Sequence, residues 1–158
     1  MTNTPCQQPE WIEQTQIILN SYAELLGREL IDRDGSKAEQ SQRLFDAPFV
    51  VVSHNTADDP ILNYGNHAAL LLWEADLKTL LQMPSRKTAE PVHRDERSEL
   101  LRRVTENGFI DDYQGIRISA TGQRFQIDQA IVWNLTDSDG NPAGQAATFT
   151  EWEMLGYA

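Results

Sequence analysis

Apolar residues along this chain follow two spacings, one typical of helices and one typical of strands. Between residues 10 and 30 they recur every three or four positions, which predicts an amphipathic helix that starts after Pro9. The stripe consists of Trp11, Thr15, Ile18, Tyr22 and Leu25. A second helix is predicted over residues 36–46, because Ser36 and Glu39 have the spacing of a capping box.

The middle of the chain predicts two strands followed by short helices. The β-branched run Phe49–Val52 is typical of a buried strand, and Ile61–Tyr64 alternates as a short strand does. Asn66 and Asp76 are suited to cap the first two helices that follow. The helices are expected over His67–Trp73, Leu77–Met83 and Arg94–Asn107.

The last third of the chain has the two-residue period of antiparallel strands. Strands are predicted over Tyr113–Ser119, Gln123–Leu135 and Gly144–Thr150, with a hairpin loop at residues 137–141. In the first of them, the face with Ile116 and Ile118 is the expected core side, opposite Tyr113, Gly115, Arg117 and Ser119. In the second, one face is expected to be buried and carries Phe125, Ile127, Gln129, Ile131 and Trp133.

The order of these elements indicates the fold class. Two strands, several short helices and three strands, without alternating βαβ units, predict an α+β protein. We expect one five-stranded antiparallel sheet with short helices on one face, preceded by N-terminal helices. Residues 1–46 would form a helical extension and residues 47–158 the domain itself.

The charge and the cysteine content of the chain argue against several kinds of partner and metal site. The formal net charge of -11, from 13 basic and 24 acidic residues, argues against direct binding of nucleic acid or an anionic membrane. Cys6 is the only cysteine, so the sequence has neither a disulfide framework nor a cysteine zinc site. The N-terminal residues lack the features of a signal peptide, and the apolar runs are too short to span a membrane, so we expect a cytoplasmic protein.

Two stretches resemble PAS domains. Ile61–Ala69 looks like the second PAS strand entering an Asn-capped helix, and residues 137–146 look like the hairpin between the last two strands. The resemblance is more specific to the MEKHLA domain, in its stand-alone bacterial form. It is found in the segments Ser53-His54, Asp59–Asn66, Pro84–Arg86, Ala89–Pro91, Gly108–Tyr113, Gly115–Ile118 and Val132–Leu135. The Met-Glu-Lys-His-Leu-Ala string that names the family is absent. The resemblance implies a PAS-like fold and a sensory role, without an established ligand or catalytic residues.

No known PAS cofactor is indicated by the residues, so the cofactor stays unknown. Cys6 precedes the PAS-like region, which argues against a chromophore bonded to cysteine and leaves noncovalent flavin open. His54, His67 and His93 are candidate haem ligands, but none is paired at metal-binding spacing. We interpret them as structural or solvated histidines and expect no metal site.

No catalytic residue is indicated by a motif. Ser53 and His54 are adjacent on a strand and would point to opposite faces. Asp111 and Asp112 are typical of a solvated turn. An acid–base enzyme that uses Asp111, Asp112 or His54 remains the minor alternative.

Arginine and tryptophan residues provide the candidate binding groups. Arg86 and Arg117 would suit an anionic ligand, or would pair with carboxylates such as Glu90 or Asp111 at the surface. Trp73 and Trp133 are interpreted as core residues, with ligand stacking as the alternative. Gln129 lies on an expected apolar face and needs a polar partner there.

These observations favour a sensory or small-ligand-binding module that signals through protein association. The candidate pocket comprises Phe49, Val51, His54, Tyr64, Trp73, Arg86, Arg117, Gln129, Ile131 and Trp133. A homodimer or a protein partner is expected, through the helical stripe residues Trp11, Ile18, Tyr22 and Leu25, although the same stripe could instead pack on the domain. The alternative function is a protein–protein interaction module with a filled core.

Overall fold

The computed structural model describes residues 5–88 and 94–157. The helices are α1 (Pro9–Leu26), α2 (Lys37–Phe45), α3 (His67–Trp73), α4 (Leu77–Leu80), the 3-10 helix η1 (Ser85–Thr88) and α5 (Arg94–Asn107). The strands are β1 (Val50–His54), β2 (Leu62–Gly65), β3 (Phe109–Ile118), β4 (Gln123–Thr136), β5 (Pro142–Phe149) and β6 (Glu151–Tyr157). In these described ranges, no helix is both long and apolar enough to cross a membrane.

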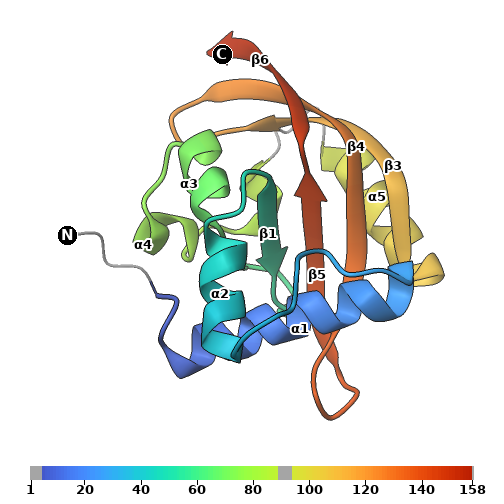
Figure 1. The fold of residues 1–158 in the computed structure, drawn as a ribbon. Coiled ribbons are helices and arrows are strands. Elements are labelled where there is room, and N and C mark those ends of the chain that lie inside the picture. The colour runs from blue at the N-terminus through green and yellow to red at the C-terminus, as the bar shows by residue number, and fades with distance from the viewer. Residues whose placement is uncertain (1–4, 89–93, 158) are drawn as a thin grey trace.

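One antiparallel sheet organises the molecule and confirms the predicted α+β class (Figure 1). Its strand order is β2-β1-β5-β4-β3, which contains the five predicted strands. A sixth strand was not predicted: β6 continues after β5 and pairs with residues 123–128 of β4. The long β4 therefore pairs with β6 along its first half and with β5 along its second half.

Helices cover both faces of this sheet. Figure 1 shows α1 crossing one face of the sheet, with α5 beyond the opposite face. The buried residues accordingly form two clusters, one between the sheet and α1 with α2, and one between the sheet and α3 with α5. We call these the α1 face and the α5 face of the sheet.

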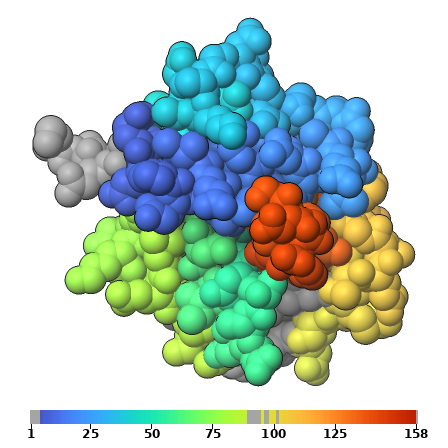
Figure 2. Space-filling model, turned by 90° about the horizontal axis from the view of Figure 1, so that it is seen from below, coloured from blue at the N-terminus to red at the C-terminus, as the bar shows by residue number. Residues whose placement is uncertain are grey.

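The amphipathic stripe of α1 is buried against the sheet of its own chain. Trp11 stacks on Tyr64 of β2 with ring centroids 4.5 Å apart, and Tyr22 meets Trp133 of β4 edge-on at 5.0 Å. Ile18 is fully buried and Leu25 is half-buried. Seen from below, α1 lies between α2 and the loop that follows β1 (Figure 2). The expectation that this stripe faces a second copy is wrong, because its apolar area is already covered.

Local chemistry explains where the first two helices begin and end. The helix predicted over residues 10–30 ends at Leu26, because Gly27 takes a left-handed φ of 72° and donates its N–H to Ala23. The predicted capping box of α2 is confirmed: Ser36 accepts from the Glu39 N–H, and the Glu39 carboxylate accepts from the Ser36 N–H. These backbone and side-chain hydrogen bonds lower the pKa of Glu39 below its ordinary value.

Asn66 connects three elements by hydrogen bonds from one buried side chain. Its Oδ1 accepts from the N–H groups of Val51 and Ala69, so it caps α3 and binds β1. Its Nδ2 donates to the carbonyls of Leu44 in α2 and Phe49 before β1. All the polar atoms of this fully buried amide are therefore satisfied, as a low-dielectric interior requires.

A bulge at Gln129 reverses the facing of β4. Gln129 is a non-glycine residue with a φ of 49°, and the pairing with β3 shifts register beside it. Before it, Phe125 and Ile127 face the α5 side, and after it Ala130 and Val132 do. The expectation of one continuous buried face through Phe125, Ile127, Gln129, Ile131 and Trp133 is therefore wrong: Ile131 and Trp133 pack on the α1 side, and Gln129 itself is exposed.

The expected facing of β3 is also wrong. Tyr113, Gly115, Arg117 and Ser119 form the buried row, whereas Gln114 is exposed and Ile116 and Ile118 are only half-buried. An arginine can occupy an interior row because its aliphatic stem packs with apolar residues while its head meets polar ones.

Candidate functional site

A cavity of about 70 Å³ lies on the α5 face, between the sheet, α3, η1 and α5. Strands β1, β3, β4 and β5 form its floor. Two small side chains on central strands, Ala130 of β4 and Ala147 of β5, contribute to the space, because a methyl group occupies less volume than a larger apolar side chain. Most of the wall is apolar, with Leu62, Ile127 and Val132 among its residues.

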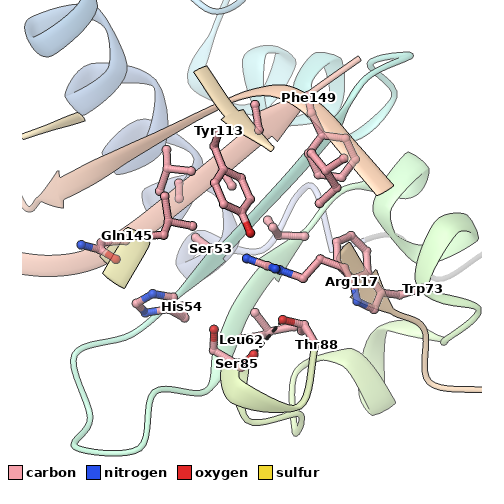
Figure 3. Close-up of a pocket in the computed structure, with 17 residues that line it drawn as sticks. Ser53, His54, Leu62, Trp73, Ser85, Thr88, Tyr113, Arg117, Gln145 and Phe149 are labelled. Atoms are coloured by element: carbon pink, nitrogen blue, oxygen red, sulfur yellow. Dashed lines mark hydrogen bonds between the residues drawn. The ribbon is translucent and has the colours of Figure 1, made fainter. Parts of the chain in front are cut away.

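Among the described wall residues, seven besides Trp73 have polar side-chain atoms, and they come from four strands and helices far apart in sequence. They are Ser53 and His54 of β1, Ser85 and Thr88 of η1, Tyr113 and Arg117 of β3, and Gln145 of β5. Figure 3 shows the Arg117 side chain extending into the centre of the cavity, with Tyr113 above it and Thr88 below it.

Arg117 is a buried cation without a carboxylate partner in the described part of the chain. It is 8% exposed, and its Nη1 donates to the Ile116 carbonyl at 3.0 Å. Its guanidinium carbon lies 5.1 Å from the centroid of the Tyr113 ring, within the range of a cation–π contact. Within residues 5–88 and 94–157, no ion pair includes Arg117.

Gly115 explains how Tyr113 reaches Arg117. The two residues share a strand face with Gly115 between them, and a Cβ at position 115 would overlap the Tyr113 hydroxyl and ring. Because glycine has no side chain, the Tyr113 ring lies over position 115 and contacts the guanidinium. The sequence Tyr-Gln-Gly-Ile-Arg thus builds this part of the wall locally.

Trp73 contributes an unsatisfied donor to the same wall. Its ring packs edge-on against Phe125 and Phe149, with centroids 5.1 Å and 6.3 Å away. Its indole Nε1 is buried and has no hydrogen-bond partner within the described ranges. A buried N–H in this state costs free energy that a ligand acceptor would recover.

The remaining polar wall groups are held by their neighbours. Thr88 Oγ1 donates to the Ser85 carbonyl at 2.7 Å, and Gln145 Nε2 donates to Asn134 Oδ1 at 2.9 Å. Ser53 Oγ donates to Asn63 and accepts from Gln14. The bonds of Thr88 and Gln145 fix two side chains of the wall, whereas the Ser53 hydroxyl is held by Asn63 and by Gln14 of α1.

Three of the ten predicted pocket residues line this cavity: His54, Trp73 and Arg117. Five lie on the α1 face instead, namely Phe49, Val51, Tyr64, Ile131 and Trp133. Gln129 is exposed at the bulge, and Arg86 is exposed and paired with Asp59 at 3.1 Å. These seven residues therefore lie outside the cavity, because the bulge in β4 moves Ile131 and Trp133 to the α1 face, and because Phe49, Val51 and Tyr64 pack there as well.

Tyr113, Thr88 and Gln145 were not predicted as wall residues. The sequence pattern placed Tyr113 and Gln145 on strands. It did not show which face of the sheet each side chain occupies, and the face decides whether a residue lines the cavity or the surface. Thr88 was hidden in a segment without a periodic pattern.

The candidate residues for catalysis or cofactor binding have different surroundings in the fold. His54 Nδ1 faces the Asn55 carbonyl at 2.9 Å, and Asp111 and Asp112 are exposed. Cys6 is buried in the α1-face cluster, and His67 is exposed beside Phe45. His93 and Glu90 lie outside the described residues. No group of three metal-binding side chains occurs within the described ranges.

Curated relatives are plant proteins that are much longer than this chain. Homeobox-leucine zipper protein REVOLUTA of Arabidopsis thaliana is 25% identical over 153 residues, which cover 93% of this chain and 18% of that protein. Homeobox-leucine zipper protein HOX10 of Oryza sativa is 22% identical over 148 residues, again with 93% and 18% coverage. The chain thus spans less than a fifth of these relatives.

Solved structures with a similar fold are PAS and light-oxygen-voltage domains. A PAS domain from Colwellia psychrerythraea superposes with a TM-score of 0.60 at 12% identity and covers 70% of this chain and 91% of that one. The light-state dimer of the fungal blue-light photoreceptor Vivid gives a TM-score of 0.57 at 13% identity, with 85% and 93% coverage. The fold is therefore PAS-like.

The sequence profile of the MEKHLA domain matches residues 12–154, nearly the whole chain. This match extends from α1 to β6 and includes every element that forms the cavity. The chain therefore belongs to the MEKHLA domain family.

Proposed function

We propose that this protein is a sensory module that binds a small molecule in the cavity of its α5 face and passes the signal on through protein association. The observation that supports the proposal is the cavity itself, in which an apolar wall surrounds polar groups from distant parts of the chain. Ligand sites in proteins have this composition. A sensory role agrees with the MEKHLA family and the PAS-like fold.

The size of the cavity restricts the ligand. Pockets for drug-sized molecules and cofactors commonly enclose roughly 300–1,000 Å³. A cavity of about 70 Å³ suits a much smaller molecule unless the wall moves. We therefore propose a small metabolite rather than a flavin or haem, and a binding role rather than catalysis, in the cytoplasm.

Association would use a surface other than the stripe of α1. Exposed apolar side chains on β6, Met154, Leu155 and Tyr157, and Leu71 of α3 are available to a second copy or to another protein. The solved Vivid structure is a light-state dimer, which supports dimerisation as a form of output. With a net charge of -11, nucleic acid and anionic membranes remain poor partners.

The alternative function is an interaction module whose interior holds no ligand. The exposed apolar residues of β6 and α3 favour it, because such side chains often mark protein contacts. In that case the cavity would be a packing defect and a small-molecule ligand would be irrelevant to association.

The two functions differ in whether the cavity takes up a ligand. Native mass spectrometry of freshly purified protein, with an absorption spectrum of the same sample, detects a retained molecule and reports the oligomeric mass. An NMR screen of small metabolites then tests the cavity directly, with shifts expected at Tyr113, Thr88 and Gln145. A protein without bound mass, whose wall residues no screened molecule perturbs, would favour the interaction module.

A further inference from the structure

We propose that the cavity binds a short monocarboxylate, whose charged group pairs with the Arg117 guanidinium and whose alkyl chain lies against the apolar wall. This inference rests on the ligand-binding function proposed above and specifies its ligand class. The charge of the cavity, its hydrogen-bond donors and its size support it.

The buried charge of Arg117 favours an anionic ligand. A guanidinium stays protonated in proteins, and an unpaired buried charge is costly, so buried arginines are normally matched by carboxylates. Arg117 is only 8% exposed, yet within residues 5–88 and 94–157 its one hydrogen bond goes to the Ile116 carbonyl. The Tyr113 ring compensates one face of the cation. The described residues supply no anion, so a bound anion would complete the site.

The hydrogen-bond donors of the wall favour a ligand with acceptor oxygens. Arginine presents five N–H donors in a fixed fork that fits two carboxylate oxygens. The Trp73 indole N–H is a further wall donor without an acceptor within the described ranges. The hydroxyls of Thr88 and Ser53 already donate to protein acceptors. The unmet groups are therefore donors, and they favour a ligand that accepts.

The size and polarity of the cavity favour a short acid with one carboxylate. Water occupies about 30 Å³ per molecule in the liquid, so about 70 Å³ admits only a few non-hydrogen atoms. Among the described wall residues Arg117 is the only arginine or lysine, which favours one carboxylate rather than two. Leu62, Ile127 and Val132 would contact a short alkyl chain. These limits indicate acids of about two to four carbons.

The test compares matched acids and amides by NMR. ¹⁵N-labelled protein is titrated with acetate, propionate and butyrate, and separately with acetamide, propionamide and butyramide, at constant ionic strength held by chloride. The acids should bind about tenfold or more tightly than the amides of equal size, because hydrogen bonds to charged groups are the stronger ones. The Arg117 Nε–Hε signal should shift together with the amides of Tyr113 and Val132.

Two variants test whether Arg117 causes the preference for acids over amides. Arg117→Met should abolish the preference for acids, while Arg86→Gln should leave it unchanged, since Arg86 is exposed and paired with Asp59. Circular dichroism checks that Arg117→Met folds. If Arg117→Met does not fold, the comparison of acids with amides on the unaltered protein still tests the proposal.

Two results would overturn this inference, and they differ in what they leave standing. Equal affinity for acids and amides, or equal displacement by chloride, would exclude a carboxylate site but leave a ligand-binding cavity. If neither series, nor the wider metabolite screen, perturbs the wall residues, the proposed ligand-binding function fails as well.

Discussion

The two faces of this sheet are packed to different degrees. On the α1 face, large side chains interlock: Trp133 and Tyr64 are fully buried and each meets an aromatic ring of α1. On the α5 face, Ala130 and Ala147 stand beside a cavity that contains the buried cation Arg117. A few differences in side-chain volume therefore distinguish a close-packed structural face from a candidate binding face.

The largest effect is expected from Asn66→Ala, next to the packed face. It removes four hydrogen bonds, and the backbone groups of Val51, Phe49 and Ala69 lose their side-chain partner, while the Leu44 carbonyl still accepts from the Ala47 N–H. We expect a loss of about 3–5 kcal/mol in the free energy of unfolding, measured by urea denaturation.

Two further variants sharpen this prediction. Asn66→Ser retains only a capping oxygen for α3 and should recover about 1 kcal/mol. Thr88→Ala, on the cavity side, removes a single bond to the Ser85 carbonyl and should cost about 0.5–1.5 kcal/mol. Similar losses for Asn66→Ala and Thr88→Ala would remove the energetic difference between the two regions.

Gly115→Ala should damage the cavity wall itself. The added Cβ would overlap the Tyr113 ring, which then has to move away from Arg117. We expect a loss of about 1–3 kcal/mol in unfolding free energy and a changed near-ultraviolet circular dichroism spectrum. Gln114→Ala, at the exposed neighbouring position, should stay within about 0.5 kcal/mol of the original protein. If Gly115→Ala is equally harmless, the Tyr113–Arg117 arrangement does not depend on that glycine.

A matched pair of valines tests the difference in packing directly. Val51 on the α1 face and Val132 at the cavity are both buried strand residues. Val51→Ile should cost about 1 kcal/mol, because it forces a methyl group into a close-packed region. Val132→Ile should be neutral or stabilising, because the methyl group enters free space. Equal costs in urea denaturation would mean that the cavity is not open in solution.

The layout of the fold could be predicted from the sequence because each element has a local signal. The α1 stripe has helical spacing, Ser36 and Glu39 form their box, and Asn66 caps α3. The strand β6 was missed because Glu151–Tyr157 pairs along an exposed part of the sheet, where alternation has no buried side to mark it.

The candidate site was harder to predict because it depends on which way each strand faces. One residue, Gln129, reverses β4, and glutamine carries no sequence signal for a left-handed φ. Arg117 was identified as a candidate from its chemistry, but its row was predicted to point away from the core. Residue type therefore indicated the chemistry, and backbone irregularity decided the location.

The smallest effect is expected from Glu74, which ties the end of α3 on the cavity side to two other elements. Its carboxylate accepts from the hydroxyls of Thr121, Tyr157 and Ser119, and these bonds lower its pKa below the ordinary value of 4.5. Because the pKa is lower in the folded state, the Glu74 carboxylate stabilises the protein above pH 4.5. This stabilisation is lost as the pH falls through the folded-state pKa.

Glu74→Gln should therefore flatten the decline of the urea midpoint as the pH falls below the ordinary carboxyl value of 4.5, since the amide does not titrate. It should also speed hydrogen exchange in α3, because the bonds of an amide to these hydroxyls are weaker than those of a carboxylate. Glu39→Gln is the control on α2: glutamine can retain the capping box, so exchange in α3 should not change. If both variants leave α3 exchange unaltered, the hydrogen bonds of Glu74 do not hold the end of α3 in place.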